Sequence, residues 1–456
     1  VTDGIRCLVN EEPLSAETCL KISKTVAFLL KRKNSKNSRV VICKDTRLSG
    51  YLYEPLVTAG FISMGMDVIL VGPLPTPAVP LMIKTLRADI GVMITASHNT
   101  YEYNGLKFFD GTGTKLSSSI EQKVENIVLN NKKYSKVTNN TFVSGNAKRL
   151  EDASGRYSEF LKSTLNKTSS KKKLKIVLDC ANGATYNIAP NLFWELGHNV
   201  IAINNNPDGL NINKNCGAVD VKSLSQNVIK EKADIGFAFD GDGDRLIVVD
   251  EEGKEVDGDK IIGLLCKSYV KPKKKSNQHD VVITVMSNMG LENYLTNKLK
   301  LKIKRTSVGD INVINQMKKS KSMIGGEQSG HIILSEHSNT GDGILAALKI
   351  TEILISNKNK ASKLFDLYND FPQDKINLRY KKKNSKLLKI LGKLKNDKQY
   401  NNKKIRSLVR LSGTEPLVRI LVEGQEITDV KKKSLEIKRL VRPYLCLLYT
   451  SPSPRD

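Results

Sequence analysis

Residues 235–249, IGFAFDGDGDRLIVV, carry the strongest structural signal in this chain. Two apolar runs, 235–239 and 246–249, flank a turn in which aspartates alternate with glycines. Short apolar runs bounded by turn residues are typical of buried strands. The stretch therefore predicts two strands joined by an acidic turn.

Strand-like and helix-like patterns alternate on both sides of this stretch, which is typical of α/β units. The other predicted strands of this part are 40–43, 67–71, 88–94, 174–179, 200–203, 281–285 and 303–306. The predicted helices are 53–64, 118–130, 188–196, 221–231, 291–298 and 311–318. After about Phe371 the pattern changes to a smaller α+β unit, with strands at 376–380, 407–409 and 418–422 and helices near 384–394 and 427–441.

Length and composition agree with several folded domains. At about 150 residues per domain, 456 residues favour roughly three domains. A hydrophobic share of 39% is enough for several buried cores, so a wholly disordered chain is excluded. Residues 131–146 are polar and aperiodic and predict a linker, and residues 272–278 predict a surface loop.

The chain is strongly basic, with 73 Lys and Arg against 47 Asp and Glu and a net charge of +26. A basic nucleic-acid-binding protein is therefore the non-enzymatic alternative. Such a protein needs clustered arginines and aromatic residues, whereas the lysines here are dispersed and aromatic residues make up 6%. An AT-rich genome explains the excess, because Lys and Asn, both abundant here, have A-rich codons. A basic field would still attract small phosphorylated molecules.

Neither a membrane span nor a signal peptide is expected. The most apolar candidate, 60–83, is interrupted by Asp67 and four prolines. The seven cysteines are scattered and form no CxxC pair, which predicts reduced thiols and a cytoplasmic location. Because the chain starts at Val1 within a predicted loop, we expect residues to be missing before it. Residues 446–456 resemble the translation of a sequencing-library adapter, and we expect them to lie outside the fold.

The first motif with chemical potential is Thr95-Ala-Ser97-His98-Asn99. It places a hydroxyl in a loop at the end of a predicted strand, with Lys107 ten residues later. A hydroxyl nucleophile needs exposure, a base and, if it carries phosphate, nearby cations. The alternative is a Ser/Asn turn that only connects two elements.

The acidic turn itself is the second motif. Asp240, Asp242 and Asp244 repel one another unless a cation neutralises them, and oxygen-only ligands suit Mg²⁺. An EF-hand loop is the alternative, with Glu251 at its twelfth position. Its sixth position is Arg245 instead of glycine, and the flanking segments predict strands instead of helices.

Two further motifs could bind a ligand. In GGEQSGH, residues 325–331, glycines allow close backbone approach while Glu327, Ser329 and His331 could contact sugar hydroxyls. A glycine-rich turn with a structural histidine is the alternative. In RLSGTEPLVR, residues 410–419, two arginines flank a Ser-Gly-Thr turn, which could bind phosphate or be a plain β-turn.

Together, these motifs resemble the α-D-phosphohexomutase family from Thr2-Asp-Gly-Ile-Arg6 to about Leu445. Supporting segments are 44–50, 73–79, 179–183, 206–213 and 340–343. Within the family, the chain is most similar to the bacterial enzymes that act on glucosamine phosphates. Thr100, Cys7 and Ile311 stand where the family usually has proline, glycine and arginine.

The resemblance implies four domains around a central cleft: three α/β domains with mixed sheets and a smaller C-terminal α+β domain. The expected bounds are 1–145 for the serine-loop domain, 146–252 for the metal-loop domain, 253–368 for the sugar-loop domain and 369–445 for the phosphate-loop domain.

The resemblance also implies an activity. Ser97, as phosphoserine, would exchange its phosphoryl group with glucosamine 6-phosphate, passing through a 1,6-bisphosphate to glucosamine 1-phosphate, a precursor of UDP-N-acetylglucosamine and the cell wall. A related mutase for glucose or mannose phosphates is the alternative. The implied ligands of one Mg²⁺ per site are Ser97, Asp240, Asp242 and Asp244.

The remaining roles are implied in the same way. The other catalytic residues would be Arg6, His98, Lys107 and His331, with Lys107 as proton acceptor. The substrate would be bound by Arg245, Glu327, Ser329, His331, Arg410, Ser412, Gly413, Thr414 and Arg419.

Overall fold

The computed structural model describes residues 4–31, 38–138, 143–166, 172–269, 280–381, 384–397, 399–402, 404–412 and 416–445. The predicted loop at 272–278 and the segment 446–456 lie outside these residues. The chain divides into two compact units, each described by itself. The first comprises Val1–Met286 and Leu295–Leu367, and the second Ser287–Tyr294 and Tyr368–Asp456.

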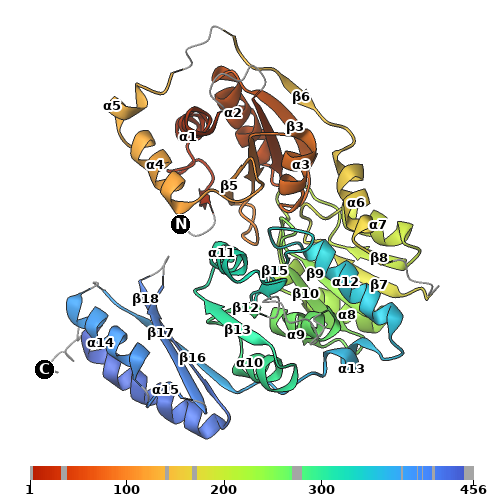
Figure 1. The fold of residues 1–456 in the computed structure, drawn as a ribbon, viewed down its shortest axis with the longest axis vertical. Helices are drawn as coiled ribbons and strands as arrows, with labels where there is room; N and C mark the ends of the chain where they lie inside the picture. The colour runs from red at the N-terminus through yellow and green to blue at the C-terminus, as the bar shows by residue number, and fades with distance from the viewer. Residues whose placement is uncertain are drawn as a thin grey trace, which may run out of the picture. The chain divides into compact units, whose positions relative to one another are not determined.

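The first sheet of the first unit has the strand order β1-β5-β4-β2-β3-β6. Its strands β3, β5 and β6 are labelled in Figure 1. Its strands are β1 (Ile5–Leu8), β2 (Arg39–Lys44), β3 (Asp67–Pro73), β4 (Ile90–Ile94), β5 (Tyr103–Asp110) and β6 (Ala147–Arg149). β5 is antiparallel to both neighbours, and the other neighbouring pairs are parallel. Its helices are α1 (Ala16–Leu30), α2 (Gly50–Ser63), α3 (Ala78–Leu86), α4 (Ser118–Val128) and α5 (Asn131–Tyr134).

The centre of this sheet is covered by helices. α2 and α3 both pack against β2 and β4, and every residue of β4 is buried. A strand covered on both faces can be apolar throughout, which explains why Ile90-Gly-Val-Met-Ile94 shows no alternation. The chain emerges from β4 directly into the loop that carries Ser97.

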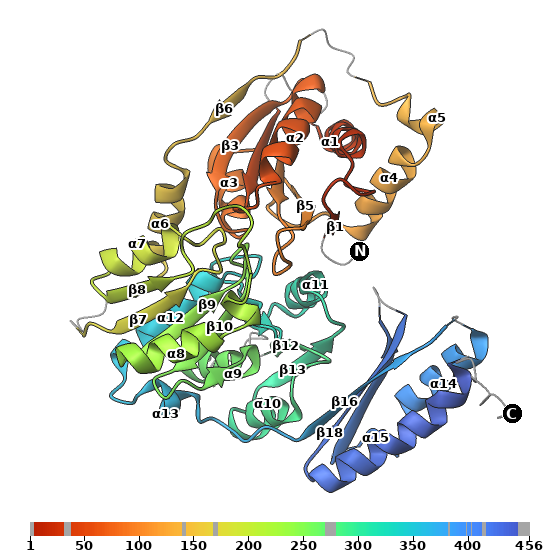
Figure 2. The same cartoon turned by 180° about the vertical axis from the view of Figure 1, so that it is seen from behind.

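The predicted linker at 131–146 is wrong at its start. Residues 131–134 form α5 because the Asn130 side chain accepts a hydrogen bond from the backbone N–H of Lys133. After residues 139–142, which are not described, β6 pairs with β3 and leads into α6 (Ala153–Ser163) (Figure 2).

The second sheet has the order β11-β10-β9-β7-β8. Its elements are β7 (Lys175–Asp179), α7 (Ile188–Glu195), β8 (Asn199–Ile203), the 3-10 turn Gly217–Val219, α8 (Lys222–Glu231), β9 (Ile235–Phe239), β10 (Leu246–Asp250) and β11 (Glu255–Val256). β9 and β10 are fully buried and antiparallel, with Phe239 opposite Leu246. This hairpin confirms the two strands predicted from residues 235–249.

The third sheet has the order β13-β12-β14-β15, with β14 and β15 antiparallel and the other neighbouring pairs parallel. Its strands are β12 (Asp280–Thr284), β13 (Lys302–Thr306), β14 (Ile324–Gly326) and β15 (Ile332–Leu334). The helices around it are α9 (Gly258–Tyr269), α11 (Asp310–Ser320), α12 (Gly343–Ser356) and α13 (Ala361–Phe365), with a π-helical turn at Tyr294–Lys298.

The second unit contains a three-stranded antiparallel sheet of order β16-β18-β17. Its elements are α10 (Met289–Asn293), β16 (Gln373–Arg379), α14 (Ser385–Asn396), β17 (Ile405–Leu411), β18 (Leu417–Gly424), α15 (Ile427–Val441) and the 3-10 turn Arg442–Tyr444. Leu387, Val422 and Ile437 belong to its hydrophobic core, which joins the sheet to α14 and α15.

The predicted fold class, three α/β parts with mixed sheets and a smaller α+β part, is confirmed. Within the described residues, every helix is too short or too polar to cross a bilayer.

Candidate active site

Ser97 sits at the meeting point of the first and second sheets. Its hydroxyl donates a hydrogen bond to Asp240 Oδ2 at 2.8 Å, although the two residues are 143 positions apart in the chain. Its backbone is left-handed, with φ of 51°, and its N–H donates to Thr95 Oγ1 at 2.8 Å. A hydroxyl nucleophile needs exposure, whereas Ser97 is 1% exposed and its loop packs against the β9–β10 turn.

A glycine makes this close approach possible. A Cβ on Gly241, in the β9–β10 turn, would lie 2.6 Å from the carbonyl oxygen of Ser97. No side chain fits at that distance. The glycines of the acidic turn therefore have a packing role as well as a conformational one.

The three aspartates of the β9–β10 turn form a compact, buried acidic cluster. One oxygen from each of Asp240, Asp242 and Asp244 lies within 4.8 Å of the others. Asp242 Oδ1 and Asp244 Oδ1 are buried without a hydrogen-bond partner among the described residues. Burial and the charges of Asp244 and Asp242 raise the pKa of Asp240 well above its usual value. These orphaned oxygens and this repulsion fit a cation held by oxygen ligands.

The EF-hand alternative is wrong. In the structure, the acidic loop joins two antiparallel strands, Ile235–Phe239 and Leu246–Asp250, whereas an EF-hand loop joins two helices.

Basic side chains surround the cluster. Lys107, on β5, places its Nζ 2.8 Å from Asp242 Oδ2 and 3.3 Å from Asp244 Oδ2. Burial alone would disfavour the charge on Asp244, but Lys107 and His331 hold the pKa of its carboxyl well below its usual value. Since Lys107 pairs with two expected metal ligands, its role as proton acceptor stays a prediction.

Three other predicted residues lie beside the serine loop. Arg6 Nη1 donates to Asn99 Oδ1 at 3.2 Å, and Arg245 Nε lies 3.9 Å from Asp240. His98 Nδ1 is 3.4 Å from Ser97 Oγ. Burial and the positive charges of Arg245 and Arg6 lower the pKa of His98 to about 4, so its ring is neutral near pH 7.

The glycine-rich loop between β14 and β15 lies against the same turn. The N–H of Leu246 donates to the carbonyl of Gly330 at 2.9 Å, and Glu327 Oε1 accepts from the N–H of Gly309. Ser329 is exposed. His331 is 3% exposed, lies 3.6 Å from Asp244, and accepts at Nε2 from the N–H of Gly341. Its predicted contact with a sugar therefore stays a prediction.

Some residues at this site carried no predicted role. Thr76 donates to Asp242 Oδ2 at 2.5 Å, and its N–H donates to the carbonyl of Asp242. Lys115 forms a buried ion pair with Asp310, whose carboxylate lies 3.8 Å from His331 Nε2. Thr76 lies in segment 73–79, which supported the family resemblance but indicated no role for this residue. No sequence pattern pointed to Lys115.

The predicted phosphate loop belongs to the second unit. Pairing of β17 with β18 places Arg410 directly opposite Arg419. Burial and the adjacent charge of Arg419 lower the pKa of Arg410. Like charges opposite one another destabilise a sheet, so this pair would be stabilised by an anion. The N–H of Ser412 donates to Leu417 O, whereas Gly413 and Thr414 lie outside the described residues.

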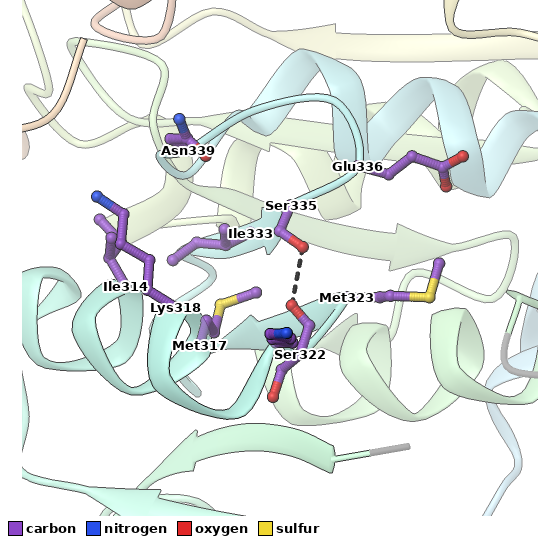
Figure 3. Close-up of a pocket in the computed structure, with 10 residues that line it drawn as sticks. Ile314, Met317, Lys318, Ser322, Met323, Ile333, Ser335, Glu336 and Asn339 are labelled. Atoms are coloured by element: carbon purple, nitrogen blue, oxygen red, sulfur yellow. Dashed lines mark hydrogen bonds between the residues drawn. The ribbon is translucent and has the colours of Figure 1, made fainter. Parts of the chain in front are cut away.

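A cavity of about 420 Å³ lies elsewhere in the first unit, between α11 and the β14–β15 pair (Figure 3). Met317, Ile333 and Ser335 are among its lining residues, and Ser335 Oγ donates to the carbonyl of Ser322. None of the predicted site residues lines it, so it is separate from the cluster around Ser97.

Comparison with known proteins assigns the chain to a family. Four profiles described as phosphoglucomutase/phosphomannomutase match in order: α/β/α domain I at residues 1–135, domain II at 155–253, domain III at 257–371 and the C-terminal domain at 376–436. The chain belongs to the phosphoglucomutase/phosphomannomutase family. The serine loop lies in its domain I, the aspartate turn in domain II, the glycine-rich loop in domain III and the arginine pair in the C-terminal domain.

Individual members of the phosphoglucomutase/phosphomannomutase family resemble the chain over nearly its whole length. The phosphoglucosamine mutase of Granulibacter bethesdensis is 46% identical over 430 residues, covering 94% of this chain and 93% of that protein. A solved family member from Burkholderia thailandensis has a TM-score of 0.83 at 21% identity, covering 97% of each chain. N-acetylphosphoglucosamine mutase of Aspergillus fumigatus, solved with GlcNAc-6P and magnesium, has a TM-score of 0.61 at 17% identity, covering 98% of this chain and 95% of that one.

Proposed function

We propose that the chain is a phosphoglucosamine mutase that interconverts glucosamine 6-phosphate and glucosamine 1-phosphate. The observation that carries the proposal is the hydrogen bond from Ser97 to Asp240 inside a buried aspartate cluster. A hydroxyl in that position can carry a phosphoryl group whose charge the cation site neutralises. The specific sugar is supported by the 46% identity to a phosphoglucosamine mutase.

The reaction consists of two phosphoryl transfers. In the first, the bond between phosphorus and Ser97 Oγ breaks while phosphorus bonds to the free sugar hydroxyl. The hydroxyl proton passes to a base, for which Lys107 in its neutral amine form is our candidate, and Ser97 Oγ takes up a proton. The resulting 1,6-bisphosphate turns over. In the second transfer, the bond between phosphorus and the other sugar oxygen breaks while phosphorus bonds to Ser97 Oγ. The serine proton passes by way of the base to that sugar oxygen, and the phosphoserine is regenerated. Arg6 and neutral His98 orient the serine loop.

Mg²⁺ is the ion that we propose for the aspartate cluster. Asp240, Asp242 and Asp244, with an oxygen on Ser97, offer only hard oxygen ligands, which Mg²⁺ prefers. When bound, the ion neutralises negative charge that develops during phosphoryl transfer. Magnesium in the Aspergillus fumigatus relative agrees with this choice.

The phosphate that does not react needs its own site. Arg410 and Arg419, with Ser412, Gly413 and Thr414, are our candidates because two arginines at opposite positions of a strand pair offer several N–H donors and positive charge to a phosphate. Since the bisphosphate must be held in both orientations, this site should recognise phosphate and not a particular sugar carbon.

The sugar ring is assigned to the glycine-rich loop, with Glu327 and Ser329 as the residues that distinguish an amine from a hydroxyl at C2, and Arg245 and His331 beside them. We also propose domain bounds at residues 145, 252 and 368 and a cytoplasmic location.

The test is a mutase assay on glucosamine, glucose and mannose 6-phosphates, with Ser97→Ala as the inactive control. We expect a preference for glucosamine 6-phosphate in kcat/KM on the order of ten- to a thousandfold, because unmatched polar groups in a binding site are costly. Equal efficiency on all three would instead support a broad phosphoglucomutase/phosphomannomutase. Activity retained in Ser97→Ala would overturn Ser97 as the phosphoryl carrier.

A further inference from the structure

The carbonyl group of Ser97 is held from two directions by side chains of different domains. From domain I, Arg47 Nη2 donates to it at 3.0 Å. From domain II, Asn213 Nδ2 donates to it at 2.8 Å and also to the carbonyl of Asn99 at 2.8 Å. The backbone around the expected nucleophile is therefore fixed by donors on both sides of the domain boundary.

Arg47 provides the fixed half of this arrangement. It is 1% exposed, and its Nε donates to Asp45 Oδ2 at 2.8 Å. Its other N–H groups donate to the carbonyls of Asn99 and Tyr103 at 2.8 and 2.9 Å. Because all of these partners lie in domain I, Arg47 holds the serine loop wherever domain II lies.

Asn213 provides the hydrogen bonds to the serine loop that come from domain II. It is 4% exposed, has a left-handed backbone with φ of 56°, and its N–H donates to the carbonyl of Ala181 at 2.9 Å. Its Nδ2 would lie 2.6 Å from a Cβ on Gly241, so it is wedged between the serine loop and the acidic turn. The side chain thus ties the metal-binding part of domain II to the main chain of the nucleophile.

We propose that Asn213 is a positioning residue that holds the Ser97 loop in the geometry needed for phosphoryl transfer. This inference rests on the proposed function. In-line transfer requires the attacking and leaving oxygens to be aligned, and small displacements of a reacting group cost much of the rate. Asn213 makes that alignment depend on the docking of domain II, which also brings Asp240 to Ser97.

Two substitutions at Asn213 separate positioning from packing. Asn213→Gly removes the side chain and tolerates the left-handed backbone. Asn213→Asp keeps the shape and also tolerates that backbone, but it places a carboxylate against two carbonyl oxygens. Asn211→Ala is the matched control, since the Asn211 side chain contacts only residues 206 and 208 of its own loop among the described hydrogen bonds.

We expect kcat to fall about tenfold in Asn213→Gly and about a hundredfold in Asn213→Asp, with KM changed much less. The control should match the wild type. A role in packing alone predicts the opposite order, with the isosteric Asp variant the more active. That order, or wild-type kcat in Asn213→Gly, would overturn the proposal.

A second measurement does not depend on the substrate assignment. Hydrogen exchange of the backbone amides of residues 97–103 should be faster in both Asn213 variants than in Asn211→Ala, at unchanged melting temperature. Unchanged exchange in that segment would overturn the positioning role even if turnover falls. If the wild type fails on glucosamine phosphates while exchange changes as expected, the proposed substrate is wrong and the positioning role stands.

Discussion

The serine site and the arginine pair differ in how their charges are arranged: opposite charges are paired around Ser97, whereas like charges lie opposite one another in the arginine pair. Around Ser97, Lys107 neutralises Asp242 and Asp244 at short range, and these groups are buried within the first unit. On β17 and β18, Arg410 and Arg419 face one another as like charges. The first region pairs opposite charges before a substrate arrives, whereas the second brings two like charges together, an arrangement that favours binding of an anion. Such a contrast suits a mutase. The reacting groups must stay in place, whereas the bound sugar phosphate must reorient between the two transfers.

The largest effect is expected at the organised site. Ser97→Ala removes the proposed phosphoryl carrier, so kcat should fall by at least about a thousandfold, with the melting temperature nearly unchanged. Ser118→Ala, at an exposed serine of α4, is the control and should be fully active. A Ser97→Ala enzyme within tenfold of wild type would mean that the phosphoryl group is carried elsewhere.

A smaller effect is expected from changing one proposed metal ligand. Asp242→Asn removes one negative charge, so the Mg²⁺ concentration for half-maximal activity should rise about ten- to a hundredfold. The rise of melting temperature on adding Mg²⁺ should shrink in parallel. Asp152→Asn, at an exposed aspartate paired with Arg156, should leave both titrations unchanged. Identical Mg²⁺ curves for Asp242→Asn and wild type would contradict the metal assignment.

The arginine pair should affect binding more than chemistry. Arg410→Gln should raise KM about tenfold and lower kcat much less, because the phosphate it holds does not react. Inorganic phosphate should stabilise the wild type more than the variant. Arg379→Gln, at an exposed arginine on β16 of the same sheet, is the control. A fall in kcat with constant KM would place Arg410 in the chemistry and remove the contrast between the two regions.

The smallest effect concerns the cost of a buried charge. Burial raises the pKa of Asp342, the residue that caps α12, to about 6. The folded state holds the Asp342 proton more tightly than the unfolded state does. Ionisation of Asp342 therefore lowers the free energy of unfolding as pH rises from about 4, its pKa in the unfolded chain, and the full cost is reached above about pH 6. Asp342→Asn should therefore be more stable than wild type at pH 7, by about 2 kcal/mol, with the advantage lost near pH 4. Calorimetry that shows a pH-independent difference would contradict this.

Most of the architecture could be predicted from local sequence. The β9–β10 hairpin, α8 and the strands of the second unit were clear because apolar runs end at turn residues. The helices α1, α3, α6, α9, α12 and α13 were not predicted. Nearly the whole of α12 is buried, so it shows no polar face, and its start depends on the cap provided by Asp342. A helix that is buried nearly throughout, as α12 is, lacks the amphipathic period on which the predictions relied.

The site divides in the same way. Four site residues could be found from local patterns. Ser97 is a hydroxyl in a loop after a predicted strand, and Asp240, Asp242 and Asp244 alternate with glycines directly after an apolar strand. Asn213, Arg47 and Thr76 could not be assigned a role, because their function lies in contacts between segments 50 or more residues apart. A single sequence does not specify such contacts.

The central claim is that Ser97 carries the phosphoryl group between the two positions of the sugar. The most direct test incubates the protein with radiolabelled glucosamine 1,6-bisphosphate, identifies the labelled peptide by mass spectrometry, and then adds unlabelled glucosamine 6-phosphate. We predict one phosphoryl group on Ser97, which then transfers to the sugar. A label on another residue, or a phosphorylated Ser97 that does not transfer its label, would contradict the account.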